Sequence, residues 1–491
     1  MGNVGRGAFA AMGLAGMALA FGSTAAGETL TDALSVAYQS NPTLLSERAQ
    51  LRALNETYVQ ARAGLRPQAS ASAEFDYTKD PSTFESEYDA ASVGVSISQP
   101  IYTGGAVTSQ MRAALADIQS GRQKLRETEA SVFQSVIQAY VDVRRDVQGL
   151  EIARTNVDLL AKQLEETEAR FEVGDLTRTD QAQAQARLAQ AHAEFATAQA
   201  QLAISRANYG AVVGQAPGDL APETPLPALP ATLDQAFDIA EHNNGGVLAA
   251  DFAERATAAR VAQAKAAYRP TLSLRATLGE SGSPAIYGAY ALTSGLTPGA
   301  YGQNFTASAV FTQPLFAGGL NGSNIRQALE NDNVQLIAEE TARRAAVQSV
   351  SQSWYQLMSA KANVDSDEKQ VSADQIAFEG AREEAQAGLR TTIEVLNAEQ
   401  ELQAARQALV VARHDDYVAS AGLLSAMGLL EAKTLLPSTP LYDPKAAFDK
   451  VRRAGPSLPW DGVVAAVDAL GAPGVSSAPA KPAQAGGQVL Q

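Results

Sequence analysis

The chain lacks cysteine and has few histidines, and these shortages exclude several kinds of chemistry. With no cysteine in 491 residues, disulfides, thiolate sites and a lipid anchor through cysteine are all excluded. The three histidines (His192, His242 and His414) are far apart and lack ligand spacing, so we expect no metal site and no cofactor. The formal net charge of −15 argues against nucleic acid as a partner.

Long apolar runs are also scarce. Only Ala8–Phe21 stands out, and its 14 residues are fewer than the roughly 20 that a membrane-spanning helix needs. Arg6 precedes this run and small residues follow it, which predicts an export signal peptide over residues 1–26. A retained anchor helix is the alternative. No later segment predicts a transmembrane helix, so we expect the mature protein to leave the cytoplasm.

The heptad Gln99–Gly105 (QPIYTGG) returns as Gln313–Gly319 (QPLFAGG), 214 residues later. The same offset aligns the two halves without a gap from Gln99 to Gly214, and an offset of 203 aligns the earlier parts. Duplication on this scale predicts that each half is one structural unit. The heptad itself is too stiff at proline and too flexible at Gly-Gly for a helix interior, so we interpret it as a strand-helix junction. The predicted junction residues are Pro100, Gly104, Gly105, Pro314, Gly318 and Gly319.

Alternation of apolar and polar residues precedes each heptad. Ser92–Ser98 places Val93, Val95 and Ile97 on one face, while Thr271–Leu278 and Phe305–Phe311 alternate in the same way, and Gln68–Tyr77 does so more weakly. Each half therefore predicts two strands joined by a loop.

After each heptad the pattern becomes helical and stays so. Val136, Val143, Leu150, Val157 and Leu164 recur every seven residues, and so do their counterparts in the second half. This spacing is typical of a coiled coil with a narrow seam.

The chain divides as follows. We expect a signal peptide (1–26), a first repeat (27–214), a proline-rich linker (215–231), a second repeat (232–428) and a C-terminal extension (429–491) that is largely disordered, with Trp460 packing on the periplasmic waist. Each repeat holds a helix, a β-hairpin (68–99; 271–312) and two long helices (106–172 and 179–213; 320–386 and 392–427).

Strands of about ten residues with one apolar face fit a transmembrane β-barrel. The alternative is a small soluble sandwich with an apolar core. Four strands cannot close a barrel, which needs about eight or more, so the chain would share a barrel with copies of itself.

Two similar turns, GDLTRTD (Gly174–Asp180) and GLRTTIE (Gly388–Glu394), break the long helices. Together with the paired junctions and the duplicated layout, they resemble those of the outer-membrane efflux proteins, or TolC-like channel-tunnels, over nearly all of Leu30–Gly428. The resemblance implies a mainly α fold class with a transmembrane β part. Each chain of a homotrimer would contribute four strands to a twelve-stranded barrel, embedded in outer-membrane lipid, above a periplasmic α-barrel of coiled-coil helices. It implies export of drugs, toxins or proteins from a Gram-negative cell, together with a periplasmic adaptor (membrane fusion) protein and an inner-membrane ABC or RND-type pump.

The resemblance also implies a periplasmic gate at the two turns. Thr179 and Asp180 match a Thr-Asp pair of the family, and Arg390 matches an arginine that links inner to outer helices, so Thr179–Arg390 is the predicted latch. Glu394 and Asn397 fall where the family can place two acidic rings; because only Glu394 is acidic, we expect one ring. A tyrosine that members can use in the latch is absent, since Ala385 occupies its position. Adaptors would dock at the tips, formed by Val173, Gly174, Leu176, Gly388 and Leu389.

Simpler interpretations exist for these residues. Asp180 and Glu394 are also typical acids of a helix N-terminus, and Arg390 could be a solvated turn residue. As whole-chain alternatives, a periplasmic adaptor would carry one hairpin rather than two matched ones, and a structural coiled coil would not need amphipathic strands. An enzyme is the least favoured class, because no nucleophile–base pair or phosphate loop is present.

Overall fold

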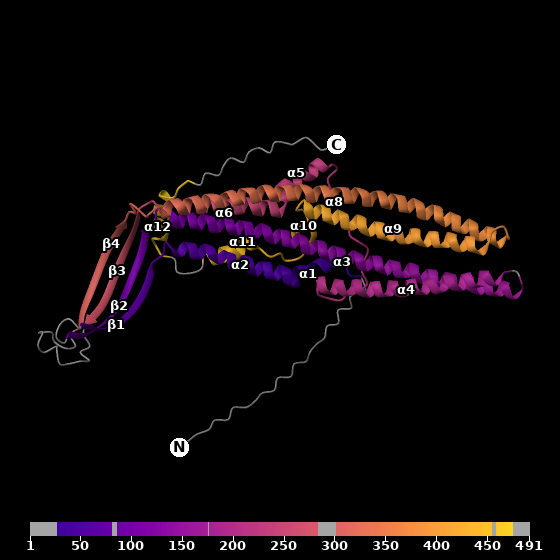
Figure 1. The fold of residues 1–491 in the computed structure, drawn as a ribbon, viewed down its shortest axis with the longest axis horizontal. Coiled ribbons are helices and arrows are strands. Elements are labelled where there is room, and N and C mark those ends of the chain that lie inside the picture. The colour runs from indigo at the N-terminus through magenta and orange to yellow at the C-terminus, as the bar shows by residue number, and fades with distance from the viewer. Residues whose placement is uncertain (1–26, 81–85, 175, 283–300, 454–457, 475–491) are drawn as a thin grey trace, which may run out of the picture.

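The computed structural model describes residues 27–80, 86–174, 176–282, 301–453 and 458–474. The predicted signal peptide lies outside these residues. The molecule is long and thin, with a four-stranded sheet at one end and two helical hairpins reaching the other (Figure 1). No helix in the described part of the chain is long and apolar enough to cross a membrane.

The two repeats form the same series of elements. The first comprises α1 (Leu30–Ser40), α2 (Pro42–Ala63), β1 (Gln68–Asp80), β2 (Ser86–Tyr102), α3 (Ala106–Glu172) and α4 (Arg178–Val213). The second comprises α5 (Leu233–Asn243), α6 (Gly245–Ala266), β3 (Thr271–Gly282), β4 (Tyr301–Thr312), α8 (Leu320–Gln386) and α9 (Thr392–Ala426).

The four strands pair antiparallel in the order β1-β2-β3-β4 and leave β1 and β4 as open edges. Residues that pair across strands lie on one face, so Val95, paired with Leu278, shares a face with Phe305, which pairs with Leu278 in turn. The opposite face carries Ser96, Thr277 and similar polar side chains. The sheet thus has an apolar face and a polar face, as the alternation predicted.

Each heptad ends a strand and starts a helix of 67 residues. The N-cap residues Gly105 and Gly319 have φ of 82° and 86°, a left-handed conformation that glycine adopts at little cost. The side-chain amide of Gln99 donates to the carbonyl of Leu65 at 2.9 Å, and that of Gln313 to the carbonyl of Tyr268 at 3.0 Å. The repeated glutamine therefore ties each junction to the helix that precedes the hairpin.

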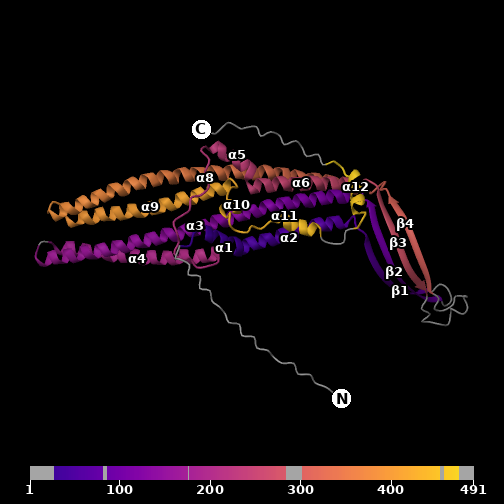
Figure 2. The same cartoon turned by 180° about the vertical axis from the view of Figure 1, so that it is seen from behind.

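The long helices pack pairwise into two hairpins, α3 with α4 and α8 with α9, which run side by side (Figure 2). The apolar residues that recur every seven positions along α3 and α8 are buried or half-buried in each seam. The largest core cluster surrounds Phe133 and Tyr140, near the middle of the molecule, and includes residues of α1, α4 and α9. The linker passes over this cluster, where the Tyr140 hydroxyl donates to the Ala221 carbonyl at 2.7 Å.

The C-terminal extension differs from the disorder expected of it. Its described residues contain α10 (Ala432–Leu435), α11 (Pro444–Arg452) and α12 (Asp461–Leu470), while residues 475–491 lie outside the described part. The extension runs along α2 back to the sheet (Figure 1). Trp460 is not at the waist, because its indole N–H donates to Gln99 Oε1, 3.4 Å away, near the C-terminal end of β2. The sequence could not reveal this packing, since the extension has no counterpart in the first half.

Candidate gate between the two helical hairpins

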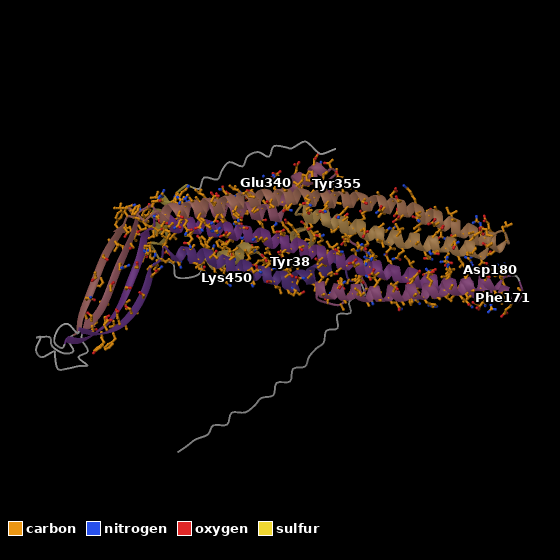
Figure 3. The ribbon with its side chains drawn as sticks, viewed as in Figure 1. Tyr38, Phe171, Asp180, Glu340, Tyr355 and Lys450 are labelled. Atoms are coloured by element: carbon orange, nitrogen blue, oxygen red, sulfur yellow. The ribbon has the colours of Figure 1, made fainter. Side chains whose placement is uncertain are left out.

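The predicted docking residues lie at the tips of the hairpins. Val173 is 80% exposed at the end of the first hairpin, and Leu389 is 78% exposed at the end of the second. Gly174 and Gly388, with φ of 82° and 76°, allow the chain to reverse there. Phe171 and Asp180 mark this end of the molecule, farthest from the sheet (Figure 3).

The two acidic residues of the predicted gate cap their own helices. Asp180 accepts hydrogen bonds from the backbone N–H and the hydroxyl of Thr177, at 2.9 and 2.7 Å. Glu394 does the same with Thr391, at 2.9 Å for both. These hydrogen bonds lower the pKa of each carboxyl below its ordinary value, so both groups are ionised at neutral pH. Capping and a role in a gate are compatible, because the capped carboxylates remain near the surface.

Arg390 pairs with Glu384 in its own turn, with Nε 2.5 Å from Oε2. Thr179 is exposed, and among the described residues no hydrogen bond joins it to Arg390. The predicted latch is therefore not made within one chain. It stays a prediction for the assembled protein.

A different polar contact joins the hairpins near the tips. Nη2 of Arg187 on α4 donates to Oδ1 of Asn397 on α9 at 3.2 Å. Asn397 was predicted for the gate, whereas Arg187 was missed. A signal for it exists, since Arg187 is the only basic residue between Arg178 and Arg206 apart from His192, in a helix rich in alanine and glutamine.

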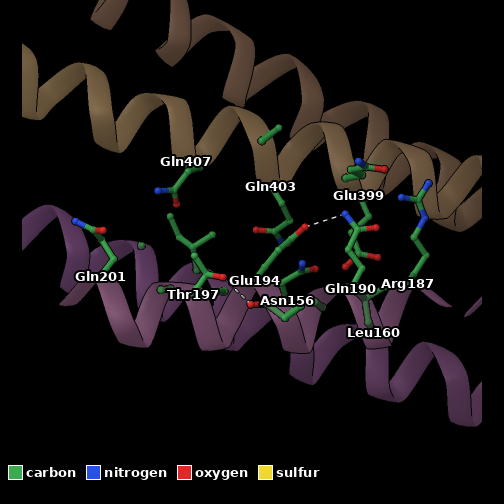
Figure 4. A pocket seen from close by; sticks show the side chains of 18 of the residues that line it. Asn156, Leu160, Arg187, Gln190, Glu194, Thr197, Gln201, Glu399, Gln403 and Gln407 are labelled. Carbon is green, nitrogen blue, oxygen red and sulfur yellow. Dashed lines mark hydrogen bonds between the residues drawn. The ribbon is translucent and has the colours of Figure 1, made fainter. Parts of the chain in front are cut away.

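Arg187 also lines a cavity of about 640 Å³ between α3, α4 and α9 (Figure 4). Its walls are rich in amides, with Gln190, Gln403 and Gln407 among them. A small apolar cluster of Leu160, Ala191 and Leu396 joins the two hairpins and forms part of the cavity wall.

Glu399 lines this cavity and is only 3% exposed. Its Oε1 makes no hydrogen bond within the described part of the chain. Burial raises the pKa of this carboxyl to about 7, because a charge there would lose its hydration without gaining a cationic partner. The hairpin interface thus holds a carboxyl that titrates near neutral pH, which the sequence pattern alone did not reveal.

His414 forms a second titratable contact farther from the tips. Its Nδ1 lies 2.8 Å from Oδ1 of Asp415, and its Nε2 contacts Asp142 on α3. Burial alone would lower the pKa of His414, but the hydrogen bonds to Asp142 and Asp415 outweigh it and raise the pKa. No group of metal-ligating side chains occurs in the residues described here.

The family model described as "Outer membrane efflux protein" matches residues 33–215 and 237–429. These two matches coincide with the two repeats. The chain is 32% identical over 432 residues to the outer membrane efflux protein BepC of Brucella suis, covering 88% of this chain and 92% of that protein. It is 26% identical over 452 residues to the outer membrane protein TolC of Escherichia coli, covering 86% of this chain and 87% of TolC.

The fold is also that of a solved outer-membrane protein. The outer membrane protein VceC of Vibrio cholerae superposes with a TM-score of 0.68 at 20% identity, covering 81% of this chain and 96% of VceC. The predicted fold class is confirmed: the chain has long helices and four antiparallel strands, arranged as in VceC. The predicted outer-membrane location and efflux function are confirmed as well. The chain belongs to the outer membrane efflux protein family.

Proposed function

We propose that three copies of this chain form one continuous export channel, with the strands in the outer membrane and the helical hairpins in the periplasm. The observation that carries this proposal is the four-stranded sheet with one apolar face, one polar face and two open edges. Strand edges in lipid must be paired, so the sheet has to close with other copies. Three copies supply twelve strands, within the size range of membrane barrels.

The hairpin tips form the periplasmic gate. Threefold symmetry brings three Glu394 carboxylates around one axis, and their low pKa keeps them charged. The resulting negative potential favours cations at the entrance. The contact between Arg187 and Asn397 holds the two hairpins of each chain together beside this ring. Opening requires that the hairpins separate, which breaks this contact.

The exposed tips receive a periplasmic adaptor protein, which connects the channel to an inner-membrane pump of the ABC or RND type. Val173 and Leu389 support this role, because each tip exposes one large apolar side chain that a bound partner would cover. Gly174, Leu176 and Gly388 complete the tips. The chain conducts cargo for multidrug efflux or type I secretion and catalyses no reaction.

The mass and location of the native assembly test this proposal. Outer membranes extracted with a mild detergent should yield particles of about three times the chain mass that conduct ions in planar bilayers. A monomer in the soluble periplasmic fraction would contradict both the shared barrel and the gate.

A further inference from the structure

The helix α12 is held firmly at the junction between β2 and α3. The carboxylate of Asp468 is fully buried and accepts five hydrogen bonds. Oδ1 accepts from Thr103 N–H at 2.7 Å, Thr103 Oγ1 at 2.7 Å and Gly105 N–H at 3.2 Å. Oδ2 accepts from Thr108 N–H at 3.2 Å and Thr108 Oγ1 at 2.7 Å. Five donors on one carboxylate fix both the position and the rotation of α12.

This anchor exists in the first repeat alone. At the offset of 214, Ala317 and Gly322 replace Thr103 and Thr108, so the second junction lacks both hydroxyls. A Cβ added to Gly105 would lie 2.3 Å from Cα of Ala472, which shows how closely the C-terminal segment covers the first junction. Nothing described lies within 4 Å of the same position at Gly319.

The anchored helix turns an entirely apolar face outward. This outer face of α12 consists of the residues of the helix that are exposed: Gly462, Val463, Ala466, Val467, Ala469 and Leu470. Val463 is 64% exposed and Leu470 is 89% exposed. A helix that faces water normally carries polar residues on its exposed side. The outer face of α12 therefore matches an apolar environment.

The position of α12 identifies that environment. Trp460 reaches Gln99, and the register pairs Gln99 with Leu274, so Gln99 belongs to the apolar face of the sheet. Ile97, the next residue on that face, is 46% exposed. The helix thus lies at the end of the sheet where β2 joins α3, next to the apolar face to which Gln99 belongs (Figure 1). A tryptophan at such a boundary is typical of the membrane interface.

We propose that α12 is an interfacial helix, called the foot below. Its outer face inserts into the inner leaflet of the outer membrane and continues the lipid-facing surface of the barrel. The inference rests on the proposed membrane barrel. The anchor of Asp468 sets the depth of the barrel, because it couples a lipid-bound helix to the strand-helix junction. A second copy of the chain is a weaker candidate for this surface, since α12 packs mainly on β2 and α3, and neither of these forms an open edge of the sheet.

Site-specific quenching tests the foot in the full-length protein. Because the chain has no cysteine, each variant carries one environment-sensitive dye. Val463→Cys and Leu470→Cys probe the foot, Val95→Cys marks the apolar face of the sheet, and Lys450→Cys, exposed on α11, marks the aqueous side. The proteins are reconstituted in vesicles of phosphatidylethanolamine and phosphatidylglycerol that contain an acyl-chain nitroxide quencher, and iodide serves as the aqueous quencher.

Each outcome decides the proposal. We expect the nitroxide to quench the dyes at 463 and 470 to within about twofold of the dye at 95, while iodide quenches only the dye at 450. Quenching of 463 and 470 by iodide alone would overturn the foot, and protection from both quenchers would overturn it in favour of a second copy. If the dye at 95 also escapes the nitroxide, the membrane barrel fails, and the foot fails with it.

Discussion

Nε2 of His414 on α9 lies 2.9 Å from Oδ1 of Asp142 on α3, and this contact joins the two helical hairpins of the chain. His414 is largely buried, so the contact is protected from water. Together with Glu399 it places two groups whose pKa values are raised above their ordinary values in the surface along which the hairpins must separate.

The first prediction is that the channel opens more readily as the pH rises. Both pKa values are raised in the packed state, so packing is favoured when the groups are protonated and is weakened as the pH rises through them. For Glu399 the shift from 4.5 to about 7 corresponds to at most about 3 kcal/mol. Single-channel open probability should increase as the pH rises from about 4.5 to about 7 through Glu399, and His414 should extend the increase above pH 6.5.

Two variants separate these groups. Glu399→Gln keeps a neutral side chain in the cavity, so it should keep the hairpins packed at high pH and flatten the profile. Other charged groups surround the two sites: Arg187 and Glu194 on α4 and Asp146 on α3 also line the cavity, and Arg145 lies near His414. His414→Gln should remove only part of the pH dependence of opening, because Glu399 remains. An unchanged profile in both variants would contradict the prediction.

The second prediction concerns the ring of Glu394. Glu394→Gln should lower the preference for cations in planar bilayers, because three charges leave the axis of the trimer. Glu401→Gln is the matched control, since it removes the same charge from an exposed position on α9. Equal selectivity in the two variants would show that Glu394 only caps its helix.

The third prediction concerns the contact between Arg187 and Asn397. Arg187→Ala and Asn397→Ala should each raise the open probability, and the double variant should add little to either one. A double-mutant cycle should give a coupling of about 0.5–1.5 kcal/mol, as for an ordinary hydrogen bond. Arg206→Ala, on the same helix, serves as the control. Additive effects would mean that the two side chains act independently.

The fourth prediction compares the two junction glycines. Gly105→Ala and Gly319→Ala both place a side chain at positive φ, which costs about 1–2 kcal/mol. Gly105→Ala must also displace the backbone at Ala472, so it should lower the melting temperature further and expose the C-terminal extension to proteases. Equal melting temperatures for both variants would show that the extension does not hold this junction.

The sequence alone determined the duplicated architecture. The heptads, the seven-residue spacing and the alternation around Val95 are local patterns. They predict strand-helix junctions, coiled-coil helices and β-strands, respectively. The structure places β1, β2, α3 and α8 within a few residues of the predicted ranges for this reason. The tips at Gly174 and Gly388 followed from the same logic, because helices must end where the chain reverses.

Only the tertiary structure decided which side chains meet across the hairpins. Arg187 with Asn397 and His414 with Asp142 are separated by more than 200 residues, and no period relates them. The same holds for Asp468, whose partners lie at the first junction. Such contacts depend on the rotation of each helix about its axis, which packing fixes over the whole length of the molecule. A sequence pattern predicts which face of a helix is apolar, but the partner of a lone polar residue is decided by the packed structure.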